Sequence, residues 1–195
     1  MAGPLLVIVT GAPGSGKTTL ARRLAADLPL PLIAKDDIKE ALFDTLGWSD
    51  LAWSRRLGRA SYRLLYHFVG VELEAGRPAI VESNFSTASQ ADFHALLARH
   101  DATPFQIVCE TERGTLLARY HARAASAARH PGHADEAIYD EFLAALDAGA
   151  YGPLDLGGPV VRIDTTDFAR VDYSGLLARL RATLAARYEP PPSRA

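Results

Sequence analysis

Short apolar runs alternate with stretches of helical periodicity along most of this chain. Five runs rich in Leu, Ile and Val predict strands at residues 5–10 and 31–34 and in the segments RPAIVESNF, PFQIVCE and GPVVRID. Apolar positions recur at helical spacing over about residues 17–28, 36–47, 53–75, 86–100, 112–127, 135–146 and 171–187. Five strands joined by helical crossovers predict an α/β fold with a doubly wound parallel sheet, which binds ligands beyond the carboxyl ends of its strands.

Several of these predicted helices have recognisable ends. Lys35 or Asp36 begins the second helix, and Gly47 ends it. Ser86 or Thr87 is the expected N-cap of the helix that follows the third strand. The segment RHPGH, residues 129–133, interrupts the helical pattern between the fourth and fifth strands.

A glycine-rich segment follows the first strand with the spacing of a phosphate-binding loop. The residues GAPGSGKTT fit the pattern G-x4-G-K-T, between an apolar strand and an amphipathic helix. Such a loop turns backbone N–H groups toward a triphosphate, and the helix N-terminus adds its positive end. Lys17 is expected to reach the β- and γ-phosphates, and Thr18 to bind Mg²⁺. The expected nucleotide-binding residues are Gly11, Ala12, Pro13, Gly14, Ser15, Gly16, Lys17, Thr18 and Thr19.

Acidic residues follow the second and third strands, where a parallel sheet places its ligands. Asp36 is the candidate general base for an acceptor hydroxyl, although it could instead cap the helix, which is the expected role of Asp37. Lys39, one turn later, faces either the acceptor or solvent. Glu82 is a candidate metal-side carboxylate and Asn84 a candidate acceptor contact, or both satisfy local backbone groups.

Three arginines lie on and just after the helix that follows the fourth strand. Arg119 and Arg123 are four residues apart and therefore share a helix face, from which they could clamp phosphate oxygens. Arg129 follows, beside a proline and a glycine that could act as a hinge. We expect a lid over about residues 119–136 that excludes water during phosphoryl transfer, although arginines on exposed helix faces are also common.

Two other groups of side chains carry weaker signals. His130 and His133 lie near each other without a third metal ligand, so substrate contact or lid packing is the better interpretation. Aromatic residues between the second and third strands either line an acceptor pocket or belong to the core: Phe43, Trp48, Trp53 and Tyr62.

Composition narrows the class of protein further. A chain of 195 residues with 48% hydrophobic residues predicts one globular domain over residues 1–189, followed by a flexible tail over 190–195. No apolar run approaches the roughly 20 residues of a membrane span, and no signal sequence is evident, so we expect a cytoplasmic protein. The net charge of −2 argues against binding of long nucleic acid. The single cysteine, Cys109, is expected to pack within a strand.

The segments GAPGSGKTT, KDDIKEAL, IVESNF and RYHAR together resemble the small P-loop kinases, which include phage-type polynucleotide 5′-kinase, chloramphenicol phosphotransferase and zeta-toxin kinases. The resemblance covers nearly the whole chain. It implies a P-loop NTPase fold with three α/β/α layers, a five-stranded parallel sheet in the order 2-3-1-4-5 and a helical lid.

The same resemblance assigns roles to individual residues. It implies that Asp36 is the general base and that Lys39 is the last basic residue of a basic-Asp-Asp-x-x-basic segment. It also implies that Arg119 and Arg123 are lid arginines, and that residues 163–167 contact an adenine base.

We therefore expect an ATP-dependent, Mg²⁺-requiring kinase that transfers the γ-phosphoryl group to a hydroxyl of a small-molecule or nucleoside-like acceptor, as a monomer or homodimer. One alternative is a nucleotide-dependent switch; the guanine-selecting motif of switch GTPases is missing from the sequence, which argues against a switch that uses GTP. The other alternative is a toxin-like sugar-nucleotide kinase. The expected catalytic residues are Asp36, Lys17 and Arg123; the metal-side residues are Thr18 and Glu82; the acceptor-side residues are Asp36, Lys39, Glu82, Asn84 and Arg129.

Overall fold

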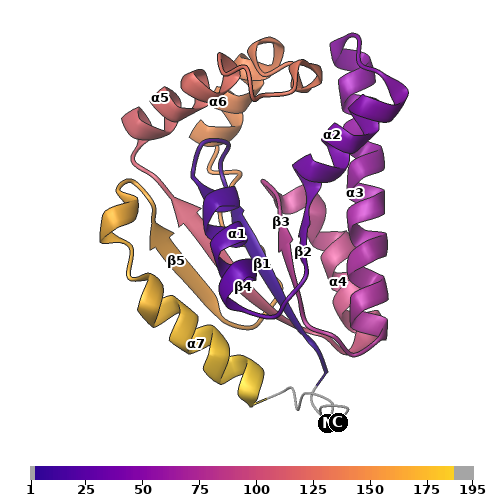
Figure 1. Cartoon of the computed structure of the whole chain (residues 1–195), viewed down its shortest axis with the longest axis vertical. Coiled ribbons are helices and arrows are strands. Elements are labelled where there is room, and N and C mark those ends of the chain that lie inside the picture. The colour runs from indigo at the N-terminus through magenta and orange to yellow at the C-terminus, as the bar shows by residue number, and fades with distance from the viewer. Residues whose placement is uncertain (1–2, 187–195) are drawn as a thin grey trace.

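A computed structural model describes residues 3–186 and places five parallel strands in one sheet (Figure 1). The strand order is β2-β3-β1-β4-β5, so the predicted α/β fold and strand order are confirmed. The strands are β1 (Leu5–Gly11), β2 (Leu32–Ala34), β3 (Ala79–Glu82), β4 (Thr103–Glu110) and β5 (Val160–Asp164). The tail predicted over residues 190–195 lies outside the described residues.

Seven α-helices connect or follow these strands within the described part of the chain. They are α1 (Lys17–Asp27), α2 (Lys35–Leu46), α3 (Leu51–Glu74), α4 (Gln90–His100), α5 (Arg113–Ala124), α6 (Tyr139–Asp147) and α7 (Tyr173–Ala185). Four short 3₁₀ turns lie at η1 (Thr87–Ser89), η2 (Pro131–His133), η3 (Glu136–Ile138) and η4 (Phe168–Arg170). No α-helix of residues 3–186 combines the length and apolarity that a membrane crossing requires.

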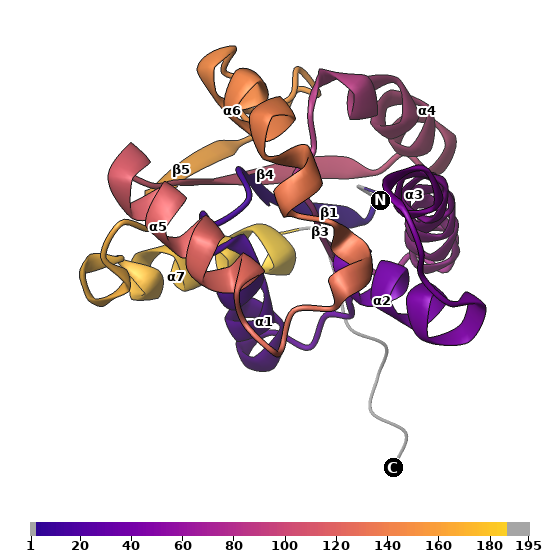
Figure 2. The same ribbon diagram turned by 90° about the horizontal axis from the view of Figure 1, so that it is seen from above.

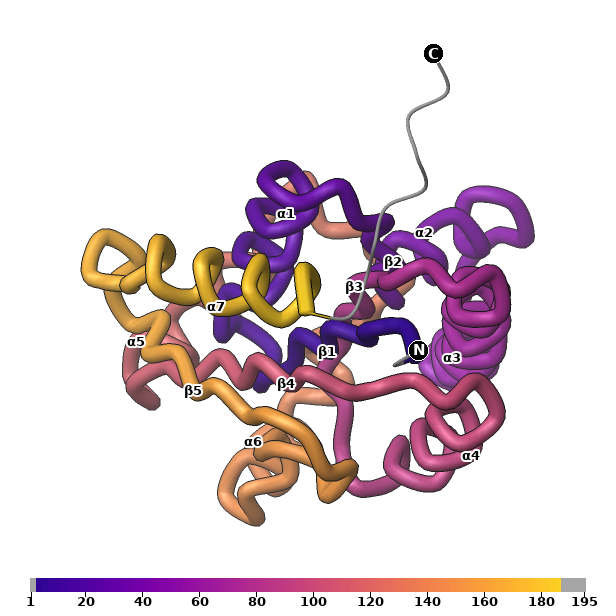
Figure 3. The backbone as a smooth tube through the Cα atoms, turned by 90° about the horizontal axis from the view of Figure 1, so that it is seen from below, coloured from indigo at the N-terminus to yellow at the C-terminus, as the bar shows by residue number. Residues whose placement is uncertain are grey.

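Strand β1 forms the centre of the core because both of its faces are covered. Leu5, Val7 and Val9 pack with the buried faces of α1 and α7. Leu6 and Ile8 point to the other face, where α3 and α4 cover the sheet (Figure 3). Alternate residues of a strand point to opposite faces, so a strand buried on both sides is apolar throughout. This burial fixes the carboxyl end of β1, and hence the loop that follows it.

A third apolar cluster lies beyond the carboxyl ends of the strands. Leu116 and Tyr120 of α5 pack there with Phe142 of α6 and with Ala12 of the loop after β1. The Tyr120 and Phe142 rings stack with their centroids 4.4 Å apart. In the view from above, α5 and α6 lie across this end of the sheet (Figure 2). The cluster therefore joins the segment that follows β4 to the loop that follows β1.

Two local predictions have different outcomes. Cys109 is buried in the core beside β1, as expected, and burial raises the pKa of its thiol to about 12. The predicted N-cap at Ser86 or Thr87 is wrong for α4, which begins at Gln90 after the turn η1. Ser86 precedes η1 without a capping bond from its side chain, because the backbone closes the turn through the Ser89 N–H and the Ser86 carbonyl.

A buried polar side chain in β4 yields a stability prediction. Gln106 is fully buried, and its amide pairs with both backbone groups of Leu154, donating to the carbonyl at 2.9 Å and accepting from the N–H at 2.8 Å. Gln106→Met keeps the volume but leaves two backbone groups unpaired, so we expect a loss of about 2 kcal/mol in the free energy of unfolding. Urea denaturation measures this loss.

The matched control is Gln90→Met, because Gln90 also binds this segment, accepting from the Asp155 N–H at 3.3 Å in an exposed position. We expect this variant to lose less than about 0.5 kcal/mol. Equal losses in the two variants would show that the buried pairing of Gln106 contributes no more to stability than the exposed contact of Gln90.

Candidate active site

The loop between β1 and α1 is shaped by two glycines in left-handed conformations. Gly14 has φ of 89° and Gly16 has φ of 78°, a region that disfavours other residues. A Cβ at Gly14 would lie 2.8 Å from the Leu116 carbonyl oxygen, and one at Gly16 would lie 2.5 Å from the Phe168 ring. The loop is therefore enclosed between α5 and η4, and its backbone is held where a phosphate chain would approach the N-terminus of α1.

Thr165 tethers this loop to the segment after β5, and Arg119 of α5 holds that segment. Thr165, just after β5, donates its hydroxyl to the Ser15 carbonyl at 2.7 Å and lies 2.8 Å from the Thr111 hydroxyl. Arg119 donates to the carbonyls of Thr165 and Thr166 at 2.9 and 2.8 Å. Arg119 thus joins α5 to the segment after β5 and does not line the cavity described below.

Lys17 and Glu82 meet where β1 and β3 end. Lys17 is the first residue of α1, and its Nζ lies 3.9 Å from Glu82 Oε1. Thr18 donates its hydroxyl to Glu82 Oε2 at 3.2 Å. Burial lowers the pKa of Lys17 and raises that of Glu82, while the attraction between the two groups opposes both changes. Hydroxyl and carboxylate oxygens side by side suit a hard divalent cation.

Asp36 lies at the start of α2 between two cations. Its carboxylate is 3.0 Å from Lys35 Nζ and 3.2 Å from Arg129 Nη1. The side chain is 41% exposed, toward the cavity. Burial alone would raise the pKa of Asp36. The positive charges of Lys35, Arg129 and Lys17 outweigh this effect and hold the pKa well below its usual value. Asp36 is therefore ionised at neutral pH.

Asp135 holds one arginine from the last turn of α5 and one from the segment that follows it. Arg129 binds it through two hydrogen bonds, from Nε at 2.7 Å and from Nη2 at 3.1 Å. Arg123 Nη2 lies 3.7 Å from the same carboxylate, and its buried Nε has no hydrogen-bond partner among the described residues. Tyr120 donates to the Asp135 carbonyl at 2.6 Å. Asp135 was not among the residues expected from sequence, because an acidic residue in an irregular segment carries no spacing signal.

The segment that contains His130, Gly132 and His133 is packed against α2 and α3. A Cβ at Gly132 would lie 2.9 Å from the Phe43 ring, and the His130 ring stacks on Phe43 at 4.8 Å. His133 is buried, with Nε2 2.7 Å from Glu40 Oε1. Both histidines thus pack in the predicted lid region. No cluster of three or more His, Cys, Asp or Glu side chains suited to a metal exists within residues 3–186.

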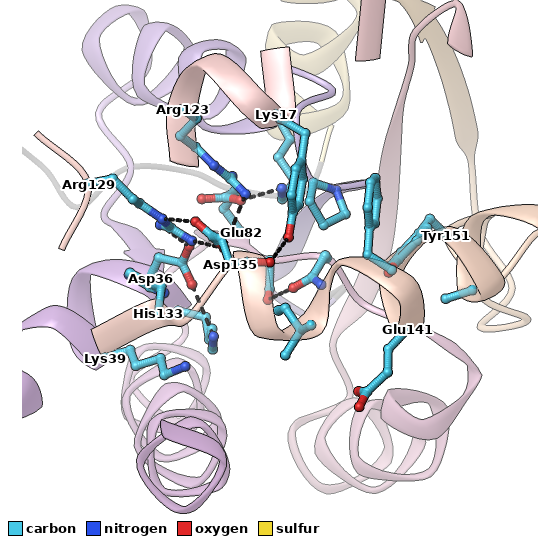
Figure 4. A pocket seen from close by; sticks show the side chains of 18 of the residues that line it. Lys17, Asp36, Lys39, Glu82, Arg123, Arg129, His133, Asp135, Glu141 and Tyr151 are labelled. Carbon is cyan, nitrogen blue, oxygen red and sulfur yellow. Dashed lines mark hydrogen bonds and ion pairs between the residues drawn. The ribbon is translucent and has the colours of Figure 1, made fainter. Parts of the chain in front are cut away.

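One cavity of about 370 Å³ unites these groups (Figure 4). The predicted site residues that line it are Pro13, Lys17, Asp36, Lys39, Glu82, Asn84, Arg123 and Arg129. Its aromatic wall comes from Tyr120, Phe142 and Tyr151. By contrast, Phe43 is buried in the lid contact and Trp48 is 53% exposed, so neither lines this cavity. The sequence did not reveal the aromatic wall because its members come from α5, α6 and a distant loop.

A glycine-rich loop with the phosphate-binding pattern follows β1, and the sheet has the order β2-β3-β1-β4-β5. Together these features define a P-loop nucleotide-binding protein with the fold of the small kinases. Within that class, the chain belongs to the AAA domain family, whose model matches residues 6–148.

Solved structures support the same assignment. A candidate kinase from Chloroflexus aurantiacus is 38% identical, with a TM-score of 0.83 over 96% of this chain and 100% of that one. The gluconokinase of Sinorhizobium meliloti shares the fold at 17% identity, with a TM-score of 0.56 over 96% of this chain and 98% of its own. The Mycobacterium tuberculosis APS kinase does so at 16% identity, with a TM-score of 0.55 over 94% and 98%. No curated protein matches the sequence.

The buried His133 predicts a pH dependence of stability. Burial lowers its pKa from 6.5 to about 3, so the folded protein holds the imidazole neutral. At pH values between these two pKa values, the unfolded chain binds more protons than the folded protein does. The free energy of unfolding therefore falls as the pH falls, by up to about 1.4 kcal/mol per pH unit. Denaturation of His133→Gln at several pH values from neutral to acidic should show a shallower slope.

The control His67→Gln removes an exposed imidazole on α3. A slope in His133→Gln equal to that of the unmodified protein would contradict the burial argument.

Proposed function

We propose that this protein is an ATP-dependent kinase that transfers the γ-phosphoryl group to a hydroxyl of a small molecule. The observation that carries the proposal is that the ionised Asp36 carboxylate and the loop lysine Lys17 line the same cavity. A kinase needs an acceptor for the hydroxyl proton beside the site of the transferring phosphoryl group. The identity of the Chloroflexus protein as a candidate kinase supports the same activity.

The loop after β1 would hold the triphosphate. Its backbone N–H groups and the N-terminus of α1 form the cradle, and Lys17 would contact the β- and γ-phosphates. Thr19 is exposed and would contribute mainly through its backbone. Arg119 and the carbonyls that it binds, after β5, would border the base.

Thr18 and Glu82 fit a magnesium ion. Their oxygens lie 3.2 Å apart at the end of the loop, and one carboxylate with one hydroxyl is the sparse protein contribution that Mg²⁺ accepts when phosphates and waters complete its shell. Bound there, the ion would neutralise charge on the β- and γ-phosphates.

Asp36 would act on the acceptor. The acceptor oxygen forms a bond to the γ-phosphorus, the bond from that phosphorus to the bridging oxygen of ADP breaks, and the hydroxyl proton passes to Asp36. Lys35 and Arg129 keep Asp36 ionised and oriented before the acceptor enters. Asn84 follows β3 in the chain and lines the cavity, where it would hydrogen-bond the acceptor.

Arg123 and Arg129 would stabilise the transferring group. Both line the cavity, and Asp135 holds both, so the guanidinium groups are positioned before charge develops. We propose that the lid of about residues 119–136 carries them and excludes water, which limits hydrolysis of ATP.

Turnover of Mg²⁺-ATP with pooled acceptors tests the activity. Pools of nucleosides, sugars, sugar nucleotides, antibiotics and 5′-hydroxyl oligonucleotides are assayed for ADP release. Stimulation by one pool supports the kinase and gives the acceptor class. Nucleotide binding without stimulation by any pool favours a nucleotide-dependent switch.

Replacing Asp36 by Asn tests its role as the base. The variant keeps shape but loses the proton acceptor, so we expect kcat to fall by about 10² to 10⁴ while nucleotide binding is retained. Kinetics with the stimulating pool and titration with a fluorescent nucleotide measure the two effects. The matched control is Asp37→Asn, because Asp37 pairs with Arg22 on the surface; comparable losses in both variants would refute the role of Asp36.

Replacing Glu82 by Gln tests the metal site. Loss of one carboxylate charge should raise the Mg²⁺ concentration needed for half-maximal nucleotide binding by about tenfold or more. Glu110→Gln is the control, because Glu110 ends strand β4 of the same sheet but pairs with Arg162 outside the cavity. An unchanged Mg²⁺ requirement in Glu82→Gln would remove this residue from the proposed site.

A further inference from the structure

We propose that Arg55 and Glu141 close the mouth of the cavity, and that the acceptor is therefore a compact molecule that the protein encloses completely. The inference rests on the proposed kinase activity and adds the size class of its second substrate. The two side chains would select the acceptor by size, without touching the reacting atoms.

Arg55 and Glu141 form an ion pair between two separate walls of the cavity. Arg55 lies near the start of α3, and Glu141 lies on α6, 86 residues later in the chain. Both side chains line the cavity. The Arg55 guanidinium donates to Glu141 Oε1, so the pair joins the two walls across the space between them.

This ion pair lies at the solvent end of the cavity, with exposed fractions of 49% and 64% for its two side chains. Figure 4 shows Glu141 apart from Lys17, Asp36 and Asp135. In each of the other ion pairs between cavity-lining residues of the described chain, at least one side chain is 13% exposed or less: Lys17–Glu82, Lys35–Asp36, Arg129–Asp36, Arg129–Asp135 and Arg123–Asp135. The exposed pair therefore marks the place where the cavity meets solvent.

Both walls are held in place beside the pair. Ser54, the residue before the arginine, is buried and donates its hydroxyl to the Gly132 carbonyl at 2.6 Å. Phe142, the residue after the glutamate, is buried and its ring stacks on Tyr120. Exposed side chains change rotamer within picoseconds to nanoseconds. The mouth can therefore open by rotation of two side chains, without a movement of α3 or α6.

An exposed ion pair suits a mouth that must open and close. Such a pair typically changes an equilibrium by about fivefold or less, because water and salt screen its charges. A compact acceptor would enter and let the pair form again behind it. A larger acceptor would keep the pair broken and lose its contribution, so the pair discriminates between acceptors by size.

The volume of the cavity agrees with a compact acceptor. The cavity holds about 370 Å³, and the γ-phosphate beside Lys17 would occupy part of it. Binding sites for small molecules range from about 300 to 1,000 Å³, so this one is near the lower limit. The space that remains beside Asp36 suits a small alcohol, whereas the end of a polymer would have to pass between Arg55 and Glu141.

An ion pair that merely stabilises α6 is the rival explanation. A matched pair allows the comparison, because Arg113 of α5 binds Asp147 of α6 with side chains that are 53% and 61% exposed. Neither of these two residues lines the cavity. Variants of the two pairs should therefore affect stability alike, but only variants of Arg55 and Glu141 should affect access to the cavity.

The lysines of the chain report on access to the cavity before any acceptor is known. The sequence has three lysines, at positions 17, 35 and 39, and all three line the cavity. Burial lowers the pKa of Lys39 to about 8, so much of this amine is uncharged and reactive at pH 8. Full-length protein is treated with the succinimidyl ester of acetate or of biotin, and mass spectrometry of its peptides gives the labelling rate of each lysine.

We expect the bulky biotin ester to label the lysines much more slowly than the acetyl ester, relative to the same protein in urea. Glu141→Gln breaks the ion pair but keeps the bulk of the side chain. It should speed labelling by the biotin ester by about two- to fivefold, with little effect on the acetyl ester. The exchanged variant Arg55→Glu/Glu141→Arg should restore the original rate, and the matched control Asp147→Asn should change neither rate.

The same variants are then compared with acceptors of increasing size from the pool that stimulates turnover. In the unmodified protein, kcat/KM should fall as the acceptor becomes larger. The fall should be less steep in Glu141→Gln and steep again in the exchanged variant.

Three results would overturn the inference: an unchanged ratio of the two labelling rates in Glu141→Gln, an equal change in Asp147→Asn, or failure of the exchanged variant to restore the ratio. A lack of stimulation by every acceptor pool is a different result. It would count against the proposed kinase activity, while the labelling rates would still report on the mouth of the cavity.

Discussion

The ion pairs around Asp135 hold the candidate active site together. Asp135 binds Arg129 through two hydrogen bonds, and Arg129 reaches across the cavity to Asp36 at the start of α2. Arg129 is therefore shared between a carboxylate of the lid region and one beside the sheet. Removing one partner of such a pair leaves a poorly compensated charge, which typically costs about 3–5 kcal/mol when the pair is buried. The arrangement of the lid thus depends on Asp135.

The same interaction links structure to the proposed chemistry. The sheet fixes Lys17, Asp36 and Glu82 at the ends of neighbouring strands, and α5 with the segment after it supplies the arginines from the other side. Phosphoryl transfer requires positive charge to be in place before negative charge develops on the transferring oxygens. Pairing among the site residues keeps that charge in place until substrates enter.

Periodicity and glycine spacing were sufficient to predict the strands, their crossovers and the loop that ends at Lys17, because these features depend on short stretches of sequence. The location of Asp36 and Glu82 at strand ends followed from the same patterns. The partners of the arginines did not: Arg119 binds carbonyls after β5, and its helix position does not reveal this. Contacts such as Ser54 with Gly132 join residues far apart in the chain, so no local pattern could indicate them.

The most direct test of the central claim is to follow the γ-phosphoryl group by ³¹P NMR while the protein acts on Mg²⁺-ATP and an acceptor pool. The account predicts a new phosphomonoester signal that grows in step with ADP, with little inorganic phosphate. Release of inorganic phosphate alone, at a rate that no acceptor changes, would contradict it and would favour a nucleotide-controlled switch.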